Sequence, residues 1–150
     1  MKYSRVIALL FLAGTLAVTG CKKNKNPEPT AKEKQTDLLA KAWTVEGSAL
    51  SVTLDGTDEI DNWPSFTVTF TKEGTYSASN VASGRDVVWP ETGTWEFKSD
   101  DNLNTIVRDD GTEIGIVVDE ATLKMTFNFS STGGRTNGTD GAWFFSMVTN

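Results

Sequence analysis

Apolar and polar residues alternate along most of the chain from Trp43 onward. Four segments show the pattern most clearly, with apolar or glycine positions separated by threonine, charged or other small residues: 66–70 (FTVTF), 93–98 (GTWEFK), 114–118 (IGIVV) and 123–129 (LKMTFNF). A period of two is typical of a strand that buries one face. The pattern therefore predicts antiparallel β structure with a polar outer face.

Four further segments complete the set of predicted strands. Trp43–Leu54 forms a long first strand whose alternation changes parity near Gly47, where a β-bulge would fit. Thr75–Asn80 and Leu103–Arg108 are shorter, and the last strand, Ala142–Thr149, is apolar on both faces. The sequence thus predicts eight strands.

One helix is predicted before the first strand. Thr30 and Glu33 have the spacing of a capping box, in which each side chain accepts from the backbone of the other residue. We expect a helix over residues 31–41 that docks through Leu38, Leu39 and Trp43 and plugs one end of the fold.

The connections between strands differ in length in a regular way. Those at 72–74, 99–102, 109–111 and 119–120 are short and polar, whereas those at 55–64, 81–91 and 131–141 are long. In an antiparallel meander the three long connections fall at one end. Such asymmetry predicts an all-β fold, an eight-stranded antiparallel up-and-down barrel that could hold a ligand, with a β-sandwich of the same strands as the alternative.

Two short motifs connect the chain with a known family. The run from Phe70 to Tyr76 (FTKEGTY), followed by Gly93-Thr94-Trp95, resembles the "tF-x-x-dGtY … GtW" pattern of lipocalin-like domains on bacterial lipoproteins. Trp43 matches the tryptophan that closes the barrel floor in lipocalins. The resemblance covers Leu38 to Asn150 and implies a calycin-type barrel that binds small, mostly apolar molecules without catalysis.

The N-terminal residues resemble the signal of a bacterial lipoprotein. Lys2 and Arg5 precede an apolar core at 6–18, and Val18-Thr19-Gly20-Cys21 resembles a lipobox. That core would span only about 20 Å as a helix, short of the roughly 30 Å of a bilayer interior. We predict a signal peptide over residues 1–20 and a lipid anchor on Cys21, palmitate included. An ordinary secretory signal with a coincidental cysteine is the alternative.

Charge and composition extend this prediction. Residues 21–30 read as a disordered tether before a domain at 31–150. Residues 22–41 carry six lysines against three acidic residues, a net of +3, whereas six basic residues face seventeen acidic ones after that, a net of −11. Such a body is a poor partner for nucleic acid, and its one predicted partner surface is a membrane. We expect an outer-membrane lipoprotein in the cell envelope of a Gram-negative bacterium, on the periplasmic face.

Catalytic chemistry has few candidates in this sequence. The chain has no histidine and a single cysteine, which excludes His-paired nucleophiles and His-based metal sites. The acidic run of Asp55, Asp58, Glu59 and Asp61 lacks the spacing of an EF-type calcium loop, so we interpret it as a solvated loop and leave calcium binding open. Paired carboxylates of a glycosidase also stay open. We predict no enzyme, no cofactor and no metal.

Four residues in the long loops are the candidates for ligand binding: Trp63, Arg85, Trp89 and Arg135. Indoles offer flat apolar faces and guanidinium groups a planar fork of donors. The alternative is that Trp63 and Trp89 fold inward as lids on the core. We therefore predict a membrane-tethered protein that binds a small apolar or amphipathic molecule at the barrel mouth. The alternative is an accessory lipoprotein with a side-chain-filled barrel that contacts a glycan or a protein.

Overall fold

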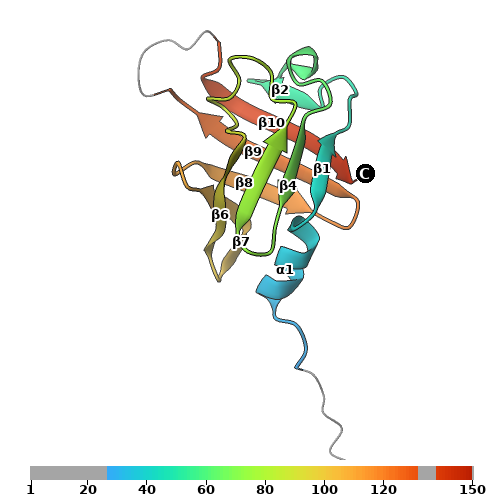
Figure 1. The fold of residues 1–150 in the computed structure, drawn as a ribbon, viewed down its shortest axis with the longest axis vertical. Helices are drawn as coiled ribbons and strands as arrows, with labels where there is room; N and C mark the ends of the chain where they lie inside the picture. The colour runs from blue at the N-terminus through green and yellow to red at the C-terminus, as the bar shows by residue number, and fades with distance from the viewer. Residues whose placement is uncertain (1–26, 132–137, 150) are drawn as a thin grey trace, which may run out of the picture.

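The computed structural model describes residues 27–131 and 138–149 (Figure 1). One helix, α1 (Ala31–Leu39), precedes the strands, and one 3₁₀ turn, η1 (Ile60–Asn62), lies between them. The strands are β1 (Ala42–Val45), β2 (Val52–Leu54), β3 (Thr57–Asp58), β4 (Thr67–Phe70), β5 (Thr75–Ser79), β6 (Thr92–Ser99), β7 (Asn102–Arg108), β8 (Glu113–Val118), β9 (Thr122–Phe129) and β10 (Gly141–Thr149).

Eight of these strands close into an antiparallel barrel. Their order is β1-β4-β5-β6-β7-β8-β9-β10, and β10 returns to pair with β1, where Trp43 lies opposite Thr149 and Val45 opposite Met147. A sandwich would leave two open sheets, whereas this sheet joins its own first strand. The predicted barrel is confirmed.

The predicted first strand is not continuous. Val45 pairs with Met147 and Val52 with Phe145, so residues 46–51 stand opposite the single residue Ser146. The change of parity near Gly47 therefore marks a longer excursion than a bulge, and both β1 and β2 pair with β10.

A short hairpin extends the sheet beyond the closed barrel. β3 pairs with β2 across Asp55 and Gly56, whose φ angles of 50° and 79° are both positive. Two positive φ angles in a two-residue loop are typical of a type I′ hairpin turn, for which Asp-Gly is a favoured sequence. The connection predicted at 55–64 thus contains β3 and η1.

Helix α1 closes one end of the barrel. Its capping box is present, since Thr30 Oγ1 accepts from the Glu33 amide at 3.1 Å and the Thr30 amide donates to Glu33 Oε2 at 2.7 Å. The helix ends at Leu39 rather than Lys41, because the Leu39 carbonyl accepts from Trp43 Nε1 at 2.9 Å where the strand begins. Leu39 and Trp43 are fully buried, which makes α1 the floor of the barrel.

The two ends of the barrel differ as predicted. We call the end with α1 the floor, and the end with the connections β3–β4, β5–β6, β7–β8 and β9–β10 the mouth (Figure 1). The C-terminal end of β10 also lies at the floor, where the Thr149 amide donates to the Ala121 carbonyl in the β8–β9 turn. The N-terminal segment therefore arrives at the end opposite the mouth.

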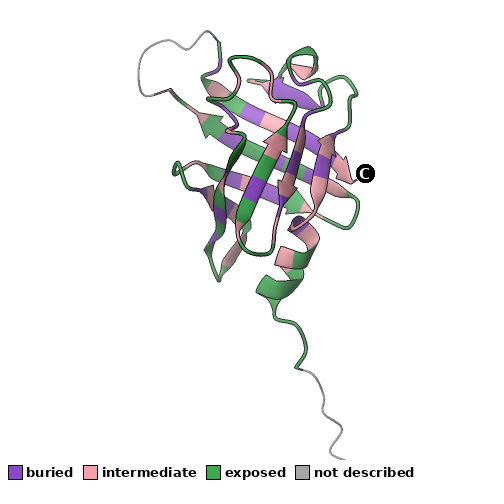
Figure 2. Cartoon of the chain, in the orientation of Figure 1, coloured by how far each residue is buried: buried purple, intermediate pink, exposed green. Residues whose placement is uncertain are grey.

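Alternation along the strands places the core inside the barrel (Figure 2). Buried positions alternate with exposed or partly buried ones in β6, β8 and β9, and with partly buried ones in β4. Five aromatic residues at apolar positions of this pattern are each at most 6% exposed: Trp43, Phe66, Phe70, Trp95 and Phe127. The phase of the alternation predicted from the sequence is confirmed.

The residues of the lipocalin-like motif contact one another across β5 and β6. Gly74 has a φ of 80°, and a Cβ there would lie 2.9 Å from the Trp95 carbonyl. Tyr76 lies opposite Gly93, where a Cβ would come within 2.7 Å of the phenol ring. Trp95 Nε1 donates to the Thr75 carbonyl at 3.1 Å. The motif therefore encodes a tight turn and an aromatic ring packed over a glycine.

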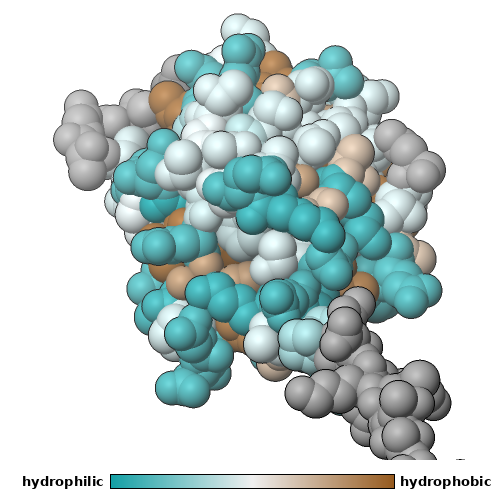
Figure 3. All heavy atoms as spheres, turned by 60° about the horizontal axis from the view of Figure 1, so that its bottom comes forward, coloured by the Kyte–Doolittle hydropathy of each residue, from teal (hydrophilic) through white to brown (hydrophobic). Residues whose placement is uncertain are grey.

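The outer surface near the floor is largely hydrophilic, with small hydrophobic areas between polar side chains (Figure 3). Exposed ion pairs lie there, including Lys32–Asp100 and Lys72–Asp37. Within residues 27–131 and 138–149, no helix combines the length and apolar character needed to cross a bilayer.

Candidate functional site

Aromatic rings fill the mouth half of the barrel interior. We call this group the aromatic chamber; it consists of Trp63, Phe66, Tyr76, Trp89, Phe127, Trp143 and Phe145. Most neighbouring rings meet edge to face, with centroids 5.0 to 6.0 Å apart. Such geometry is favourable for aromatic pairs. The chamber is thus a packed part of the core.

Strands and loops contribute to the chamber in different ways. Tyr76, Phe127 and the pair Trp143 and Phe145 stand on β5, β9 and β10, where alternation turns them inward. Trp63 and Trp89 come from mouth connections instead, and both are fully buried. Four of the seven rings therefore stand on strands, while the mouth connections supply the other three, Trp63, Phe66 and Trp89.

Three polar atoms inside the chamber have no hydrogen-bond partner among residues 27–131 and 138–149. They are Trp63 Nε1, Trp89 Nε1 and the Tyr76 hydroxyl, on side chains that are 0%, 0% and 3% exposed. A buried donor without an acceptor costs about 1–3 kcal/mol. Trp43 Nε1 and Trp143 Nε1 bond to the Leu39 and Thr139 carbonyls, so this feature is specific to the chamber's other two indoles.

The Tyr76 phenol keeps its proton at neutral pH. Burial raises the pKa of Tyr76, and the positive charge of Arg108 opposes this shift only in part. The hydroxyl is therefore a neutral group that can donate to an acceptor. The chamber as a whole presents three neutral donors.

Arg85 ties the mouth loops together. Its guanidinium donates to Glu59 Oε2 at 2.8 Å in the first long connection and to the Gly138 carbonyl at 3.3 Å in the last. It also lies over the Trp143 ring, 5.6 Å from the centroid. Arg85 and Glu59 are only 15% and 17% exposed. Arg85 is thus already engaged by three partners of the protein itself.

Arg108 supports the chamber from β7, and the sequence analysis did not single it out. The guanidinium lies 5.0 Å from the Trp89 ring and donates to the Val88 carbonyl at 3.0 Å. Asp110 and Thr112 accept its remaining hydrogen bonds. The signal was its parity, because Ile106 and Arg108 occupy the same inward face of one strand.

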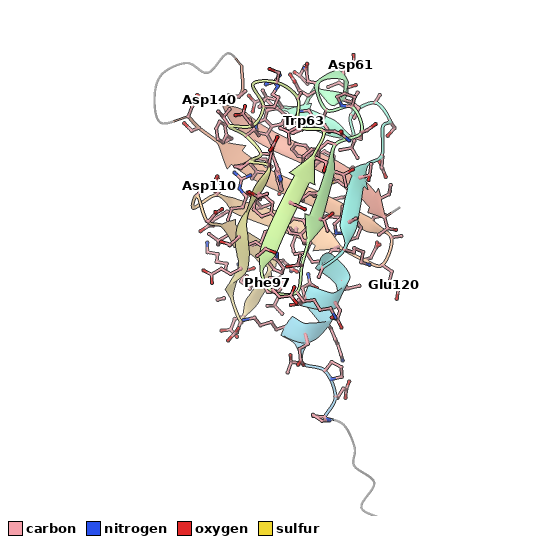
Figure 4. The ribbon with its side chains drawn as sticks, viewed as in Figure 1. Asp61, Trp63, Phe97, Asp110, Glu120 and Asp140 are labelled. Carbon is pink, nitrogen blue, oxygen red and sulfur yellow. The ribbon has the colours of Figure 1, made fainter. Side chains whose placement is uncertain are left out.

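The predicted ligand-binding residues have different places in the structure. Trp63 lies at the mouth (Figure 4). Trp89 lies at the same end of the barrel, as expected, since both indoles contact Phe66 and Phe145. They fold inward, which is the arrangement that the sequence left as the alternative. Arg85 lies between the loops. Arg135 and the predicted anchor Cys21 are outside the described residues.

The acidic loop uses its carboxylates within the protein. Asp55 accepts from the Ala142 amide, Asp58 from the Ile60 amide, and Glu59 from Arg85. Among the residues that the structure describes, no three His, Cys, Asp or Glu side chains come together as a group able to hold a metal ion.

Two hollows on the described part of the protein open to solvent. One of about 760 Å³ lies beside α1 and is lined by Pro29, Thr36 and Lys72 among others. Another of about 550 Å³ lies over β8 and β9, where Gly115 and Thr126 face solvent. The chamber itself is occupied by its own rings, so a guest there would have to displace a side chain.

Comparison with known proteins gives no further assignment. No protein-family model matches the chain, and no curated protein matches its sequence.

Proposed function

We propose that the protein is a membrane-tethered, non-enzymatic lipoprotein that holds a small amphipathic molecule in the aromatic chamber. The lipid on Cys21 would fix it to the cell envelope, on the periplasmic face of an outer membrane. The tether would join the floor, so the mouth would point away from the lipid surface.

One observation carries the proposal: the three unpaired donors inside the chamber. Buried polar groups are nearly always hydrogen-bonded in folded proteins, yet Trp63, Trp89 and Tyr76 each leave one donor without an acceptor. A guest with an apolar body and acceptor oxygens would satisfy such donors and replace ring contacts with its own. The same donors at the surface would bond to water and carry no such implication.

A second candidate is favoured by the packing of the chamber. Its rings are in contact with one another, and Trp63 and Trp89 are fully buried. A barrel filled in this way could serve as a rigid accessory domain that contacts a glycan or another protein of the envelope through its outer surface.

Copurification separates the two candidates. The mature lipidated protein would be extracted from membranes in mild detergent and analysed by native mass spectrometry, with Tyr76→Phe as the matched variant. We expect a bound small molecule on the wild type and a lower occupancy on Tyr76→Phe, because that change removes one donor and no ring. A wild type free of any guest would favour the filled-barrel domain.

The free energy of unfolding of Tyr76→Phe provides an independent test of the proposal. If the Tyr76 hydroxyl is an unmet donor, Tyr76→Phe should leave the guest-free protein equally stable or stabilise it by up to about 1 kcal/mol. A clear loss of stability would show that the hydroxyl is bonded within the fold, which contradicts the proposal.

A further inference from the structure

We infer that the indole of Trp89 is a displaceable plug, and that the space it fills is a site for a flat, uncharged aromatic molecule with hydrogen-bond acceptors. This inference rests on the proposed function and names the class of ligand that the chamber would take.

Trp89 is held in the barrel through its side chain and not through the backbone of a strand. It stands in the β5–β6 connection, in which Val88 and Trp89 are buried while Gly84, Asp86 and Val87 are exposed. The backbone hydrogen bonds described for Arg85, Val88 and Trp89 stay within this connection. Side-chain contacts, rather than a strand ladder, therefore keep the indole inside the barrel.

Aromatic rings and one guanidinium group surround the indole of Trp89. Phe66, Tyr76 and Phe127 meet the Trp89 ring edge to face, with centroids 5.8 to 6.0 Å away. The Arg108 guanidinium lies 5.0 Å from the indole ring. Tyr76, Phe127 and Arg108 are all on strands of the barrel. When the loop moves, most of this lining stays, and it has the shape of a slot for a flat ring.

The polar and charged groups around the space that Trp89 fills determine which ligands it favours. With Trp89 displaced, the Tyr76 hydroxyl and Trp63 Nε1 remain as buried donors, which favour a ligand with acceptor atoms. The charge of Arg108 is already matched by Asp110. Carboxylates surround the mouth, among them Asp61 and Asp140 (Figure 4). An anion would be repelled at the mouth and find no free cation in the described part of the chamber, so the ligand is uncharged.

Two hydrogen bonds of Arg85 keep the Trp89 connection in place at the mouth. Arg85 joins the Trp89 connection to Glu59 and to the Gly138 carbonyl. We call these two contacts of Arg85 the latch. A ligand can bind only to molecules in which the latch and the indole have moved aside, so its apparent affinity is reduced in proportion to how rare those open molecules are. Weakening the latch raises the fraction of open molecules and strengthens binding.

The experiment uses the mature protein and three probes: coumarin, coumarin-3-carboxylate and naphthalene. Coumarin is flat, uncharged and carries acceptors, while the others add a negative charge or lack acceptors. Equilibrium dialysis should show the tightest binding for coumarin. Tyr76→Phe should weaken coumarin binding about 2- to 10-fold and leave naphthalene binding unchanged, because one hydrogen bond is lost.

The latch is tested with a paired variant. Glu59→Gln/Arg85→Gln removes both charges, so neither is left buried alone, and it should bind coumarin about 2- to 10-fold more tightly than the wild type. The control Lys98→Gln/Glu113→Gln removes an exposed ion pair on the barrel wall and should leave the affinity for coumarin unchanged. Coumarin should also shift tryptophan emission to longer wavelength in the wild type, and Trp89→Phe should abolish that shift.

The outcomes distinguish this inference from the proposed function. A guest that copurifies, with no preference for coumarin, would overturn the class of ligand alone. Coumarin binding that neither the latch variant nor Trp89→Phe alters would overturn the plug. Absence of any guest and of any probe binding, even to the latch variant, would overturn the inference and the proposed function together.

Discussion

Single residues at the mouth determine how tightly the aromatic chamber is closed. Arg85 and Arg108 have the same chemistry but different surroundings: Arg85 joins loops at the edge, whereas the Arg108 side chain is fully buried beside Trp89. A buried guanidinium needs a matched anion, because an uncompensated charge inside a protein is strongly destabilising. Asp110 provides that anion and is partly open to solvent.

The pairing of Arg108 with Asp110 predicts a pH dependence of stability. Burial acts to raise the pKa of Asp110, but hydrogen bonds from Arg108 and Thr112 outweigh it and lower that pKa. A carboxyl with a lowered pKa stabilises the fold above its unfolded pKa of about 3.9, and this stability is lost as pH falls through the folded value. Asp110→Asn should therefore reduce the free energy of unfolding by about 1–2 kcal/mol at pH 7, after allowance for solvent exposure.

Denaturant unfolding at several pH values checks this prediction. The difference between Asp110→Asn and the wild type should narrow as pH falls below about 4, because the carboxyl then takes up a proton first in the unfolded chain and at lower pH in the folded protein. Asp101→Asn, in the turn at the opposite end, is the control and should match the wild type throughout. A difference that persists unchanged at low pH would mean that the charge of Asp110 is not its source.

At the scale of elements, the sequence predicted the strands well and the first of them least well. Alternation identifies β4, β6, β8 and β9 because in each strand one face is buried and the other is more open to solvent. The excursion at 46–51 contains Gly47 and Leu50, both with positive φ, and a period of two cannot describe it. The β2–β3 hairpin was missed although Asp55-Gly56 is a favoured turn pair, because the strand after it has only two residues.

The candidate site was less predictable than the strands. Loop position alone could not decide whether Trp63 and Trp89 face solvent or the core, because an indole is stable in either place. Arg108 was missed for a different reason: its parity on β7 places it on the inward face with Ile106, but arginine side chains are rarely buried, so the residue type argued against that placement. Its role depends on Trp89, which lies nearly twenty residues earlier in the chain.

Helix α1 offers a test of the floor. Leu39 is fully buried against the barrel, while its neighbour Leu38 is only partly buried. Leu39→Ala should lower the free energy of unfolding by about 2–4 kcal/mol, because it removes buried methyl groups and leaves a cavity. Leu38→Ala is the matched control and should cost less than about 1.5 kcal/mol. Thermal or denaturant unfolding measures both, and equal effects would show that the helix does not close the floor.

At the scale of the whole molecule, the two ends of the barrel have separate tasks in the proposed function. The floor receives the N-terminal segment, and the mouth carries the chamber and its latch. An anchor on Cys21 would attach the protein at the end opposite the mouth. This arrangement requires that the membrane attachment and the fold be independent of each other.

That independence can be tested on the predicted anchor. Cys21→Ser should abolish labelling by radioactive or clickable palmitate, because only the thiol can accept the diacylglyceryl group. The variant should lose the covalent lipid yet keep the unfolding midpoint of the wild type. Membrane fractionation and fluorescence-detected unfolding check the two halves. Labelling that survives the substitution would contradict the lipid anchor.

The pairing of β1 with β10 determines when the barrel can close during folding. Trp43 lies opposite Thr149, 106 positions later in the chain (149 − 43). Contacts between residues so distant form slowly, because a long loop must close before they do. The barrel cannot close while its last strand is still inside the ribosome or an export channel. If the protein is exported as the proposed function requires, the segment that carries Cys21 would cross the membrane first and the barrel would close only after β10 has followed.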